Sequence, residues 1–285
     1  MKLCRYDDDR LGLVEGDSVL DVSEALALLP ARRYPLPPGD LLIAHLDRVL
    51  ARVRELGASA RRKPLAAAAL LSPVANPPRI IGAPVNYARH QAESAADRGI
   101  SFGKEVKTIE EYGLFLKSPT SLVGPSQGVA LRFPERRNDH EAELAAVIGK
   151  GGARIPRERA LEHVAGYAIG LDMTLRGTED RSLRKSLDSY SVLGPWLVTR
   201  DEIPDPGKLE LSLSVGGVVR QRSSTRFLIF DLPRLIEYAS SFYTLHPGDI
   251  IMTGTPEGVA SVKPGDVMHC EIEGIGAMDV AVRAA

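Results

Sequence analysis

Two glutamates separated by one residue stand directly before an apolar run in this sequence. The stretch DHEAELAAVIG covers residues 139–149, and Glu141 and Glu143 precede the run 144–148. Side chains two apart on a strand point to the same face, so the two carboxylates should converge. Converging carboxylates repel, or one takes up a proton, and a hard divalent cation with oxygen ligands resolves that conflict. A solvated strand edge is the simpler explanation for an isolated pair.

A third carboxylate favours the metal hypothesis. Asp172 stands near the end of GYAIGLDMT, an apolar stretch that predicts a buried strand. A buried aspartate is rare unless it is paired or binds a metal. Three carboxylates around Mg²⁺ leave roughly three octahedral positions for water or substrate oxygens. Such an open site suits Lewis-acid chemistry on a chelating oxo acid, and the lack of a Cys/His cluster makes zinc a poorer fit.

A candidate general base precedes the carboxylates in the chain. The stretch NYARHQAES places His90 and Glu93 three residues apart, which puts them on one face of a helix. A carboxylate beside an imidazole fixes its tautomer and raises its basicity, as a general base requires. The alternative is an ordinary surface pair at the start of a helix.

Several basic residues are placed to meet anions. Lys117 stands among apolar residues in LFLKSPTS, so we expect its amine to contact an anion, and we assign it to substrate binding. Arg176 and Lys185 follow the third carboxylate, and cations near a metal site suit a substrate that carries a carboxylate. We interpret Arg181 and Arg184, which lie between them, as solvated.

A Gly/Pro turn, TGTPEGV at residues 253–259, follows an apolar strand. The hydroxyl of Thr255 and the backbone N–H groups of such a turn could hold an anion. Turns of this composition are also common as plain architecture, so the motif alone is weak evidence.

Composition excludes several classes of protein. The 285 residues include 36 Lys and Arg against 37 Asp and Glu, and the net charge of -1 argues against a nucleic-acid partner. Only two cysteines occur, which is typical of a reducing compartment. The N-terminus has no signal-peptide pattern, and no apolar run is long enough to span a membrane. We expect a cytoplasmic protein without a membrane partner.

The chain divides near residue 75 on composition. Residues 1–74 contain a predicted hairpin around Gly16 and Asp17, a helical period over 39–63, and a proline-punctuated linker. Residues 75–285 form the predicted catalytic domain, in which many short strands alternate with few helices. Those helices are expected at 86–99, 156–163 and 232–242. This pattern predicts a strand-rich α+β protein built as a roll or sandwich, not a doubly wound sheet.

Taken together, these motifs resemble the fumarylacetoacetate hydrolase family, in its small form that includes the acylpyruvate hydrolases. The resemblance runs from about Ile80 to Ala277 and rests on motifs in family order. They are NYxxH, LKSPTSLVGP, HEAELAAVIGK, GYAIGLDMT, LGPWLVT and LxPGDIIMTGTPEGV. The resemblance implies a mixed β-roll catalytic domain, a small N-terminal α/β domain and a homodimer.

The resemblance also implies roles for individual residues. Glu141, Glu143 and Asp172 would hold Mg²⁺ or Mn²⁺, and His90 with Glu93 would activate water. Residues that would contact the oxo-carboxylate end of the substrate are Arg176, Lys185 and Thr255. Residues 91–113 fall where the family has a mobile lid.

Two positions depart from the family pattern. After the arginine many members have Asp and then Gln, whereas this chain has Gly177 and Glu179. Glu179 takes the place of a residue that orients substrate or water, so the departure affects the reaction branch more than the metal. A further stretch, RQRSSTRFLIFD, suggests Arg222 or Arg226 near the substrate.

These residues predict hydrolysis of a carbon–carbon bond in a 2,4-dioxo acid, giving pyruvate and a carboxylic acid. Decarboxylation of oxaloacetate, or isomerisation or hydration of an unsaturated 2-oxo acid, would use the same metal-stabilised enolate and stays open. A dimeric β-rich binding protein with surface carboxylates is the alternative outside enzymology, and it would show no metal dependence.

Overall fold

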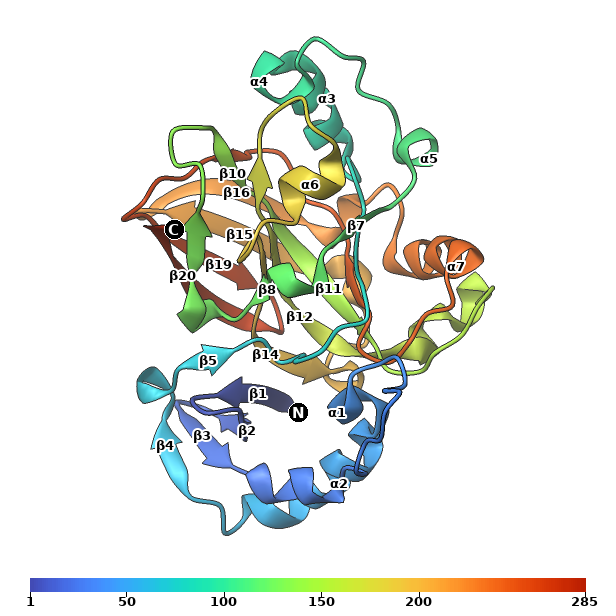
Figure 1. The fold of residues 1–285 in the computed structure, drawn as a ribbon, viewed down its shortest axis with the longest axis vertical. Helices are drawn as coiled ribbons and strands as arrows, with labels where there is room; N and C mark the ends of the chain where they lie inside the picture. Colours follow the sequence, from blue (N-terminus) through green and yellow to red (C-terminus); the bar gives the residue numbers. More distant parts are fainter.

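The computed structural model describes residues 1–285, and three β-sheets form its framework (Figure 1). The large sheet runs, from edge to edge, through β4 (Arg62–Pro64), β3 (Ser18–Asp21), β2 (Arg10–Glu15), β1 (Lys2–Tyr6), β14 (Ser191–Thr199), β12 (Val164–Asp172), β11 (Ala142–Ile148), β17 (Ile250–Met252), β6 (Ile80–Gly82) and β7 (Phe115–Lys117). Two short strands join it beside that path, β5 (Leu70–Leu71) on β1 and β8 (Leu122–Val123) on β14.

Two smaller sheets complete the strand-rich α+β fold that the sequence predicted. One contains β13 (Thr174–Leu175), β10 (Asn138–His140) and β18 (Ala260–Ser261). The other contains β16 (Val218–Ser224), β15 (Glu210–Val215), β19 (Val267–Ile272), β20 (Gly276–Ala284) and β9 (Val129–Leu131). Most neighbouring strands are antiparallel, so the doubly wound alternative is excluded.

The helices are short and lie outside the sheets. They are α1 (Leu41–Ala44), α2 (Leu46–Gly57), α3 (Ala88–Ala96), α4 (Arg98–Ser101), α5 (Ile109–Tyr112), α6 (Arg181–Lys185) and α7 (Leu232–Phe242). The helix predicted at 232–242 is confirmed, with Asp231 as its N-cap. The helix predicted at 156–163 is a 3₁₀ helix at Arg157–His163, because it is a short connector that runs directly into β12.

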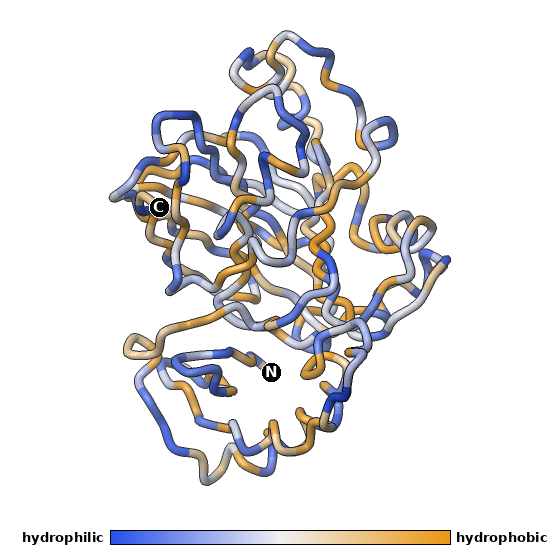
Figure 2. The backbone as a smooth tube through the Cα atoms, in the orientation of Figure 1, coloured by the Kyte–Doolittle hydropathy of each residue, from blue (hydrophilic) through white to orange (hydrophobic).

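Burial explains the two kinds of strand pattern. Every residue of β11 and β14 is buried, and these central strands are continuous apolar runs because both of their faces are covered. In β19 and β20 buried and exposed residues alternate, because one face of the outer sheet meets solvent. Figure 2 shows the same contrast, with hydrophobic residues concentrated along the interior strands and hydrophilic ones in the connections.

The N-terminal segment extends the large sheet. Its predicted hairpin is confirmed as β2 and β3, and β1 pairs antiparallel with β14, with Leu3 opposite Leu197. Figure 1 shows these strands and α2 below the larger part of the molecule. Since strands from both sides of residue 75 share a sheet, the domain boundary at that point stays a prediction.

The segment predicted as a lid, residues 91–113, covers one end of the molecule. It carries the end of α3, then α4 and α5, and Figure 1 shows it above α6. The capping box of Thr108 and Glu111 closes the start of α5, because each residue satisfies a group of the other. The lid is thus built from three short helical turns rather than from irregular chain alone.

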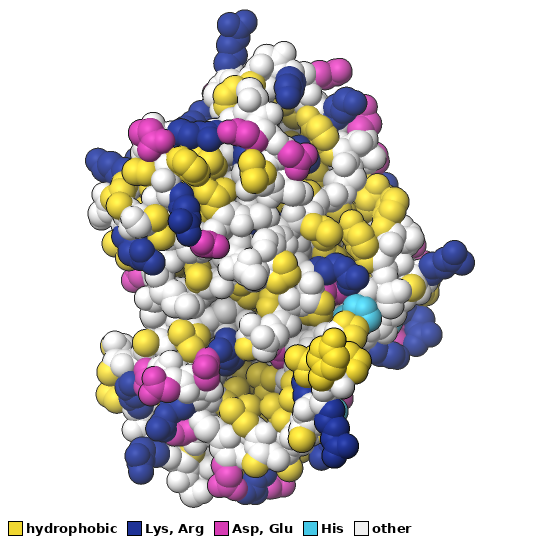
Figure 3. Space-filling model, in the orientation of Figure 1, with side chains coloured by type: hydrophobic (Ala, Val, Ile, Leu, Met, Phe, Trp, Pro, Cys, Tyr) yellow, Lys and Arg dark blue, Asp and Glu magenta, His cyan; other side chains and the backbone are white.

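The surface shows charges of both signs together. On the face in Figure 3, Lys and Arg side chains are interspersed with Asp and Glu, and no extended basic region appears there. This agrees with the near-zero net charge. None of the helices combines the length and the apolar character that a membrane span requires.

We expect the N-terminal strands and the large sheet to unfold together. Leu20 is completely buried and belongs to the same core cluster as Ala145 and Val147 of β11. Leu20→Ala should therefore lower the free energy of unfolding by about 2 to 5 kcal/mol and shift one cooperative transition. Differential scanning calorimetry would measure this, with the exposed Leu36→Ala as control. Two separate transitions, of which the mutation moves only one, would contradict the expectation.

Candidate active site

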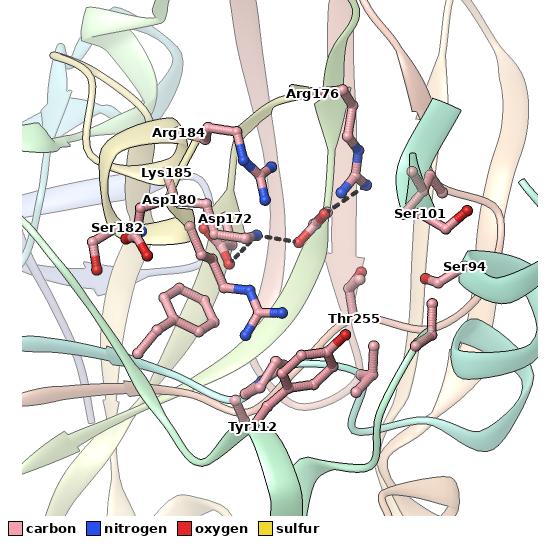
Figure 4. A pocket seen from close by; sticks show the side chains of 18 of the residues that line it. Ser94, Ser101, Tyr112, Asp172, Arg176, Asp180, Ser182, Arg184, Lys185 and Thr255 are labelled. Atoms are coloured by element: carbon pink, nitrogen blue, oxygen red, sulfur yellow. Dashed lines mark hydrogen bonds and ion pairs between the residues drawn. The ribbon is translucent and has the colours of Figure 1, made fainter. Parts of the chain in front are cut away.

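A cavity of about 880 Å³ lies beneath the lid segment. Its walls include residues of the lid, of the segment 176–185 and of the ends of β11 and β12, together with residues 83–85, residues 114–116, Tyr243 and Thr255. Figure 4 shows the side chains of Arg176, Lys185 and Arg184 gathered on one side of it, with Ser94 and Ser101 on another. The cavity therefore combines a rigid sheet end with two segments that lie outside the sheets.

The three predicted carboxylates meet at the floor of this cavity. Glu141 lies between β10 and β11, Glu143 is the second residue of β11, and Asp172 is the last residue of β12. One oxygen atom from each lies within 4.8 Å of the others, and all three side chains are buried. The pairing of β11 with β12 brings them together, since the backbone N–H of Asp172 donates to the carbonyl of Glu141 over 2.9 Å. The predicted convergence is confirmed.

Basic side chains neutralise two of these carboxylates. Lys185 Nζ donates to Glu141 Oε2 over 2.7 Å and to Asp172 Oδ2 over 2.6 Å. Arg176 Nη2 donates to Glu141 Oε1 over 2.9 Å, and Lys117 Nζ donates to Asp172 Oδ1. Burial disfavours the Glu141 carboxylate, but Lys185 and Arg176 outweigh burial and hold the pKa of Glu141 far below its usual value.

Glu143 lacks such a cation. Its only close donor is the backbone N–H of Gly254, 2.7 Å from Oε2. Burial raises the pKa of Glu143 well above its usual value, and the negative charges of Asp172 and Glu141 raise it further. The site is thus short of positive charge at one carboxylate. A divalent ion bound by the three carboxylates would supply it, and hard oxygen donors suit Mg²⁺ or Mn²⁺.

Gly254 can hold Glu143 because of its backbone conformation. Its φ of +102° lies in the region that glycine adopts readily, and a Cβ there would meet the Cβ of Asn86 at 2.7 Å. The turn predicted as an anion nest therefore binds an acidic side chain of the protein itself. The hydroxyl of Thr255 lines the cavity but donates to the carbonyl of Ala142 over 2.9 Å and accepts from Gln221.

His90 and Glu93 form the predicted pair on α3. His90 Nδ1 lies 2.9 Å from Glu93 Oε2, and Glu93 Oε1 accepts from the backbone N–H of Gly258 over 2.9 Å. His90 is buried and lines the cavity, whereas Glu93 stands behind it. With Nδ1 engaged by a carboxylate, Nε2 is the ring nitrogen left for chemistry.

Lys117 also stands behind the carboxylates. It is completely buried, donates to the backbone carbonyl of Tyr190 over 2.8 Å, and is absent from the cavity wall. Burial lowers the pKa of Lys117, although Asp172 opposes that shift. The anion predicted for Lys117 is therefore Asp172. Lys117 supports this carboxylate and does not face the cavity, so the predicted contact with substrate is not formed.

Two arginines interpreted as solvated are part of the cavity wall instead. Arg181 lies over the ring of Tyr112, with 4.4 Å from its Cζ to the ring centroid. Arg184 also lines the cavity, as Figure 4 shows. The interpretation was wrong because the lid covers α6, which a charge pattern in the sequence cannot reveal.

Gly177 and Glu179, the two positions that depart from the family pattern, depend on each other. Glu179 Oε1 and Oε2 accept from Arg136 over 2.9 Å and 3.0 Å, and Arg136 also donates to the carbonyl of Arg176. A Cβ on Gly177 would lie 2.0 Å from Glu179 Oε2 and 2.2 Å from Arg136 Nη2. A side chain at 177 would therefore displace this ion pair. Glu179 lines the cavity, but its carboxylate is already paired.

Sequence reasoning missed two buried residues that support the site. Asp139 accepts from Arg176 Nε over 2.7 Å, and Gln221 accepts from the backbone N–H of Ala142 over 3.1 Å. The suggestion of Arg222 or Arg226 near the substrate was wrong, because both are exposed and absent from the cavity wall. The signal available was strand alternation: β16 turns Gln221 inward and its neighbours outward.

Comparison with known proteins agrees with this geometry. The family model described as fumarylacetoacetate (FAA) hydrolase C-terminal matches residues 79–283. A maleylpyruvate hydrolase of Aquipseudomonas alcaligenes is 58% identical over 286 residues, covering 100% of both chains. A mitochondrial oxaloacetate tautomerase of Bos taurus is 34% identical and covers 93% of this chain and 85% of its own length.

A solved structure resembles the whole chain. It is the crystal structure of maleylpyruvate hydrolase from Sphingobium sp. SYK-6 in complex with manganese(II) ion and pyruvate. Its TM-score is 0.84 and its sequence identity 38%, with 100% of both chains covered. The sequence motifs, the matching model and this likeness together place the chain, as an enzyme, in the fumarylacetoacetate hydrolase family.

Proposed function

We propose that this enzyme hydrolyses the carbon–carbon bond between C3 and C4 of an acylpyruvate, with maleylpyruvate as the first substrate to test. The observation that carries the proposal is the presence of a three-carboxylate cluster and a His–Glu pair in one cavity. The 58% identical relative, a maleylpyruvate hydrolase, supports the choice of substrate.

Glu141, Glu143 and Asp172 would hold the metal. A divalent ion there would supply Lewis-acid polarisation of the carboxylate and 2-oxo oxygens of a bound substrate. The chain keeps these ligands in place with Lys185, with Arg176 and with the N–H of Gly254. Strands β11 and β12 fix the backbone of Glu143 and Asp172, and the carbonyl of Glu141 accepts from the backbone N–H of Asp172 over 2.9 Å.

His90 is the proposed base for the attacking water. Glu93 engages Nδ1, so Nε2 is free to take a proton from water as the oxygen attacks the C4 carbonyl. Breaking the C3–C4 bond releases the carboxylic acid and leaves the electron pair on pyruvate as its enolate. That enolate takes up a proton at C3, and the overall reaction consumes one water. Glu93 is a positioning residue, and its own anchor at Gly258 fixes it.

Lys185 and Arg176 would balance the negative charge at the pyruvate end. Lys185 Nζ lies between Glu141 and Asp172, and its third close partner is the hydroxyl of Thr174 at 2.7 Å. Removing water from this cavity would strengthen each of these interactions with the substrate. We assign closure over the substrate to the lid segment, whose residues line the cavity.

Pyruvate release from a substrate panel tests the proposal directly. With Mg²⁺ or Mn²⁺ we expect stoichiometric pyruvate from maleylpyruvate, and slower release from acetylpyruvate or fumarylpyruvate. Loss of the absorbance of the 2,4-dioxo acid would follow the same reaction. Pyruvate from oxaloacetate alone would favour decarboxylation, and conversion of oxaloacetate between its keto and enol forms would favour a tautomerase. Either result without hydrolysis would overturn the proposal.

Metal removal should abolish activity. Chelation leaves Glu143 without a positive partner, so we expect pyruvate release to stop with EDTA and to return with Mn²⁺ or Mg²⁺. Glu143→Gln should weaken Mn²⁺ binding at least about tenfold by titration calorimetry, because one charged ligand is lost. Full activity after thorough chelation would contradict the metal assignment.

His90→Ala should separate catalysis from metal binding. We expect pyruvate release to fall about 100-fold or more, the range for loss of a general base. Mn²⁺ affinity should change little, because His90 contacts Glu93 and none of the three metal-binding carboxylates. Glu93→Gln should give a smaller loss, since the imidazole stays in place. Turnover that survives in His90→Ala would remove its role in activating water.

A further inference from the structure

Two guanidinium groups in the cavity have no acidic partner. The guanidinium of Arg181 makes no hydrogen bond or ion pair. It lies over the rings of Tyr112 and Phe115, with its Cζ 4.4 Å and 5.6 Å from their centroids. Arg184 donates only to backbone carbonyls, of Glu179 over 2.9 Å and of Leu175 over 3.2 Å. Both line the cavity, so each presents an uncompensated positive charge to whatever enters.

The acidic residues beside them are engaged elsewhere. The carboxylate of Glu179 is held by Arg136 on both oxygens. Asp180 accepts from the backbone N–H of Ser182 over 2.8 Å and caps α6. Neither acid forms an ion pair with Arg181 or Arg184, although the charge of each acts on them through space. The ion pair of Arg136 and Glu179 holds the chain that leads into α6.

The helix α6 places three cations along one face. Arg181, Arg184 and Lys185 are at positions i, i+3 and i+4, which lie together on a helix surface. The ring of Phe115 faces both Arg181 and Lys185, with Lys185 Nζ 5.2 Å from its centroid. Lys185 is bound to the metal-site carboxylates, so the two arginines extend the positive surface away from them.

Electrostatics of the pair agree with this arrangement. Burial lowers the pKa of Arg181, and four neighbouring groups partly oppose the shift: Tyr112, Glu141, Asp172 and Asp180. Burial also lowers the pKa of Arg184, and the nearby positive charges of Arg176 and Arg181 lower it further. An anion between Arg181 and Arg184 would relieve both effects.

We propose that Arg181 and Arg184 bind a second carboxylate, at the end of the substrate opposite the 2-oxo acid. The assignment rests on the proposed function for the identity of the first end. It makes the enzyme selective for 2,4-dioxo diacids over the corresponding monoacids. Tyr112, a residue of the lid, stacks on Arg181 and orients it, so this contact links closure of the lid to recognition of the distal carboxylate.

Binding of two matched, unreactive probes tests the subsite without turnover. The enzyme loaded with Mn²⁺ is titrated calorimetrically with 2-oxoheptanedioate and with 2-oxoheptanoate, which differ only in the terminal carboxylate. Arg181→Gln and Arg184→Gln should each weaken binding of the diacid about 10- to 100-fold, as expected for one charge-assisted hydrogen bond. Binding of the monoacid should change less than about threefold.

Matched variants separate recognition from structure. Arg222→Gln makes the same chemical change at an exposed site outside the cavity and should leave both affinities unchanged. Arg181→Lys keeps the charge and should restore part of the diacid preference, while melting temperatures verify folding. Equal weakening of both probes, or an unchanged diacid affinity in both Gln variants, would overturn the subsite. Selective diacid binding by an enzyme that releases no pyruvate would instead overturn the reaction and leave the subsite standing.

Discussion

The whole site depends on one buried carboxylate, Glu143 of β11, that has no basic side chain as a partner. Four carboxylates and four basic side chains are packed together there: Asp139, Glu141, Glu143 and Asp172 with Lys117, Arg137, Arg176 and Lys185. The basic groups pair with every carboxylate except Glu143, which has one backbone donor. Burying an unpaired carboxylate is costly. The fold bears that cost at Glu143. The arrangement is stable only if a proton or a metal ion neutralises this carboxylate.

The part of the site predictable from sequence is the part built by strand geometry. The two-residue spacing of Glu141 and Glu143, and the place of Asp172 at a strand end, follow from local periodicity, and the sheet brings them together. The i, i+3 spacing of His90 and Glu93 is equally local. These contacts are encoded within a few residues, so a pattern in the sequence is enough to find them.

What escaped prediction involves contacts across long sequence separations. Arg181 was interpreted as solvated, but the ring of Tyr112 covers its guanidinium. Tyr112 belongs to the lid segment, and no local sequence pattern places that segment above α6. Gln221 reaches the site across the interface between two sheets. Lys117 was expected to face substrate. It is instead buried and donates to Asp172, because a lysine at that depth needs a fixed anion.

The cavity joins residues held by the large sheet to residues of a short helix outside the sheets. The large sheet positions the metal-binding carboxylates. Arg181 and Arg184 belong to the five-residue helix α6, and the Arg136–Glu179 ion pair holds the chain before it. A maleylpyruvate and an oxaloacetate each carry two carboxylates, but the separation of those carboxylates differs. Lys185 of the same helix donates to Glu141 and Asp172, so the position of α6 also bears on the support of the carboxylate cluster. Gly177 leaves room for that anchor, because a Cβ at this position would lie 2.0 Å from Glu179 Oε2 and 2.2 Å from Arg136 Nη2.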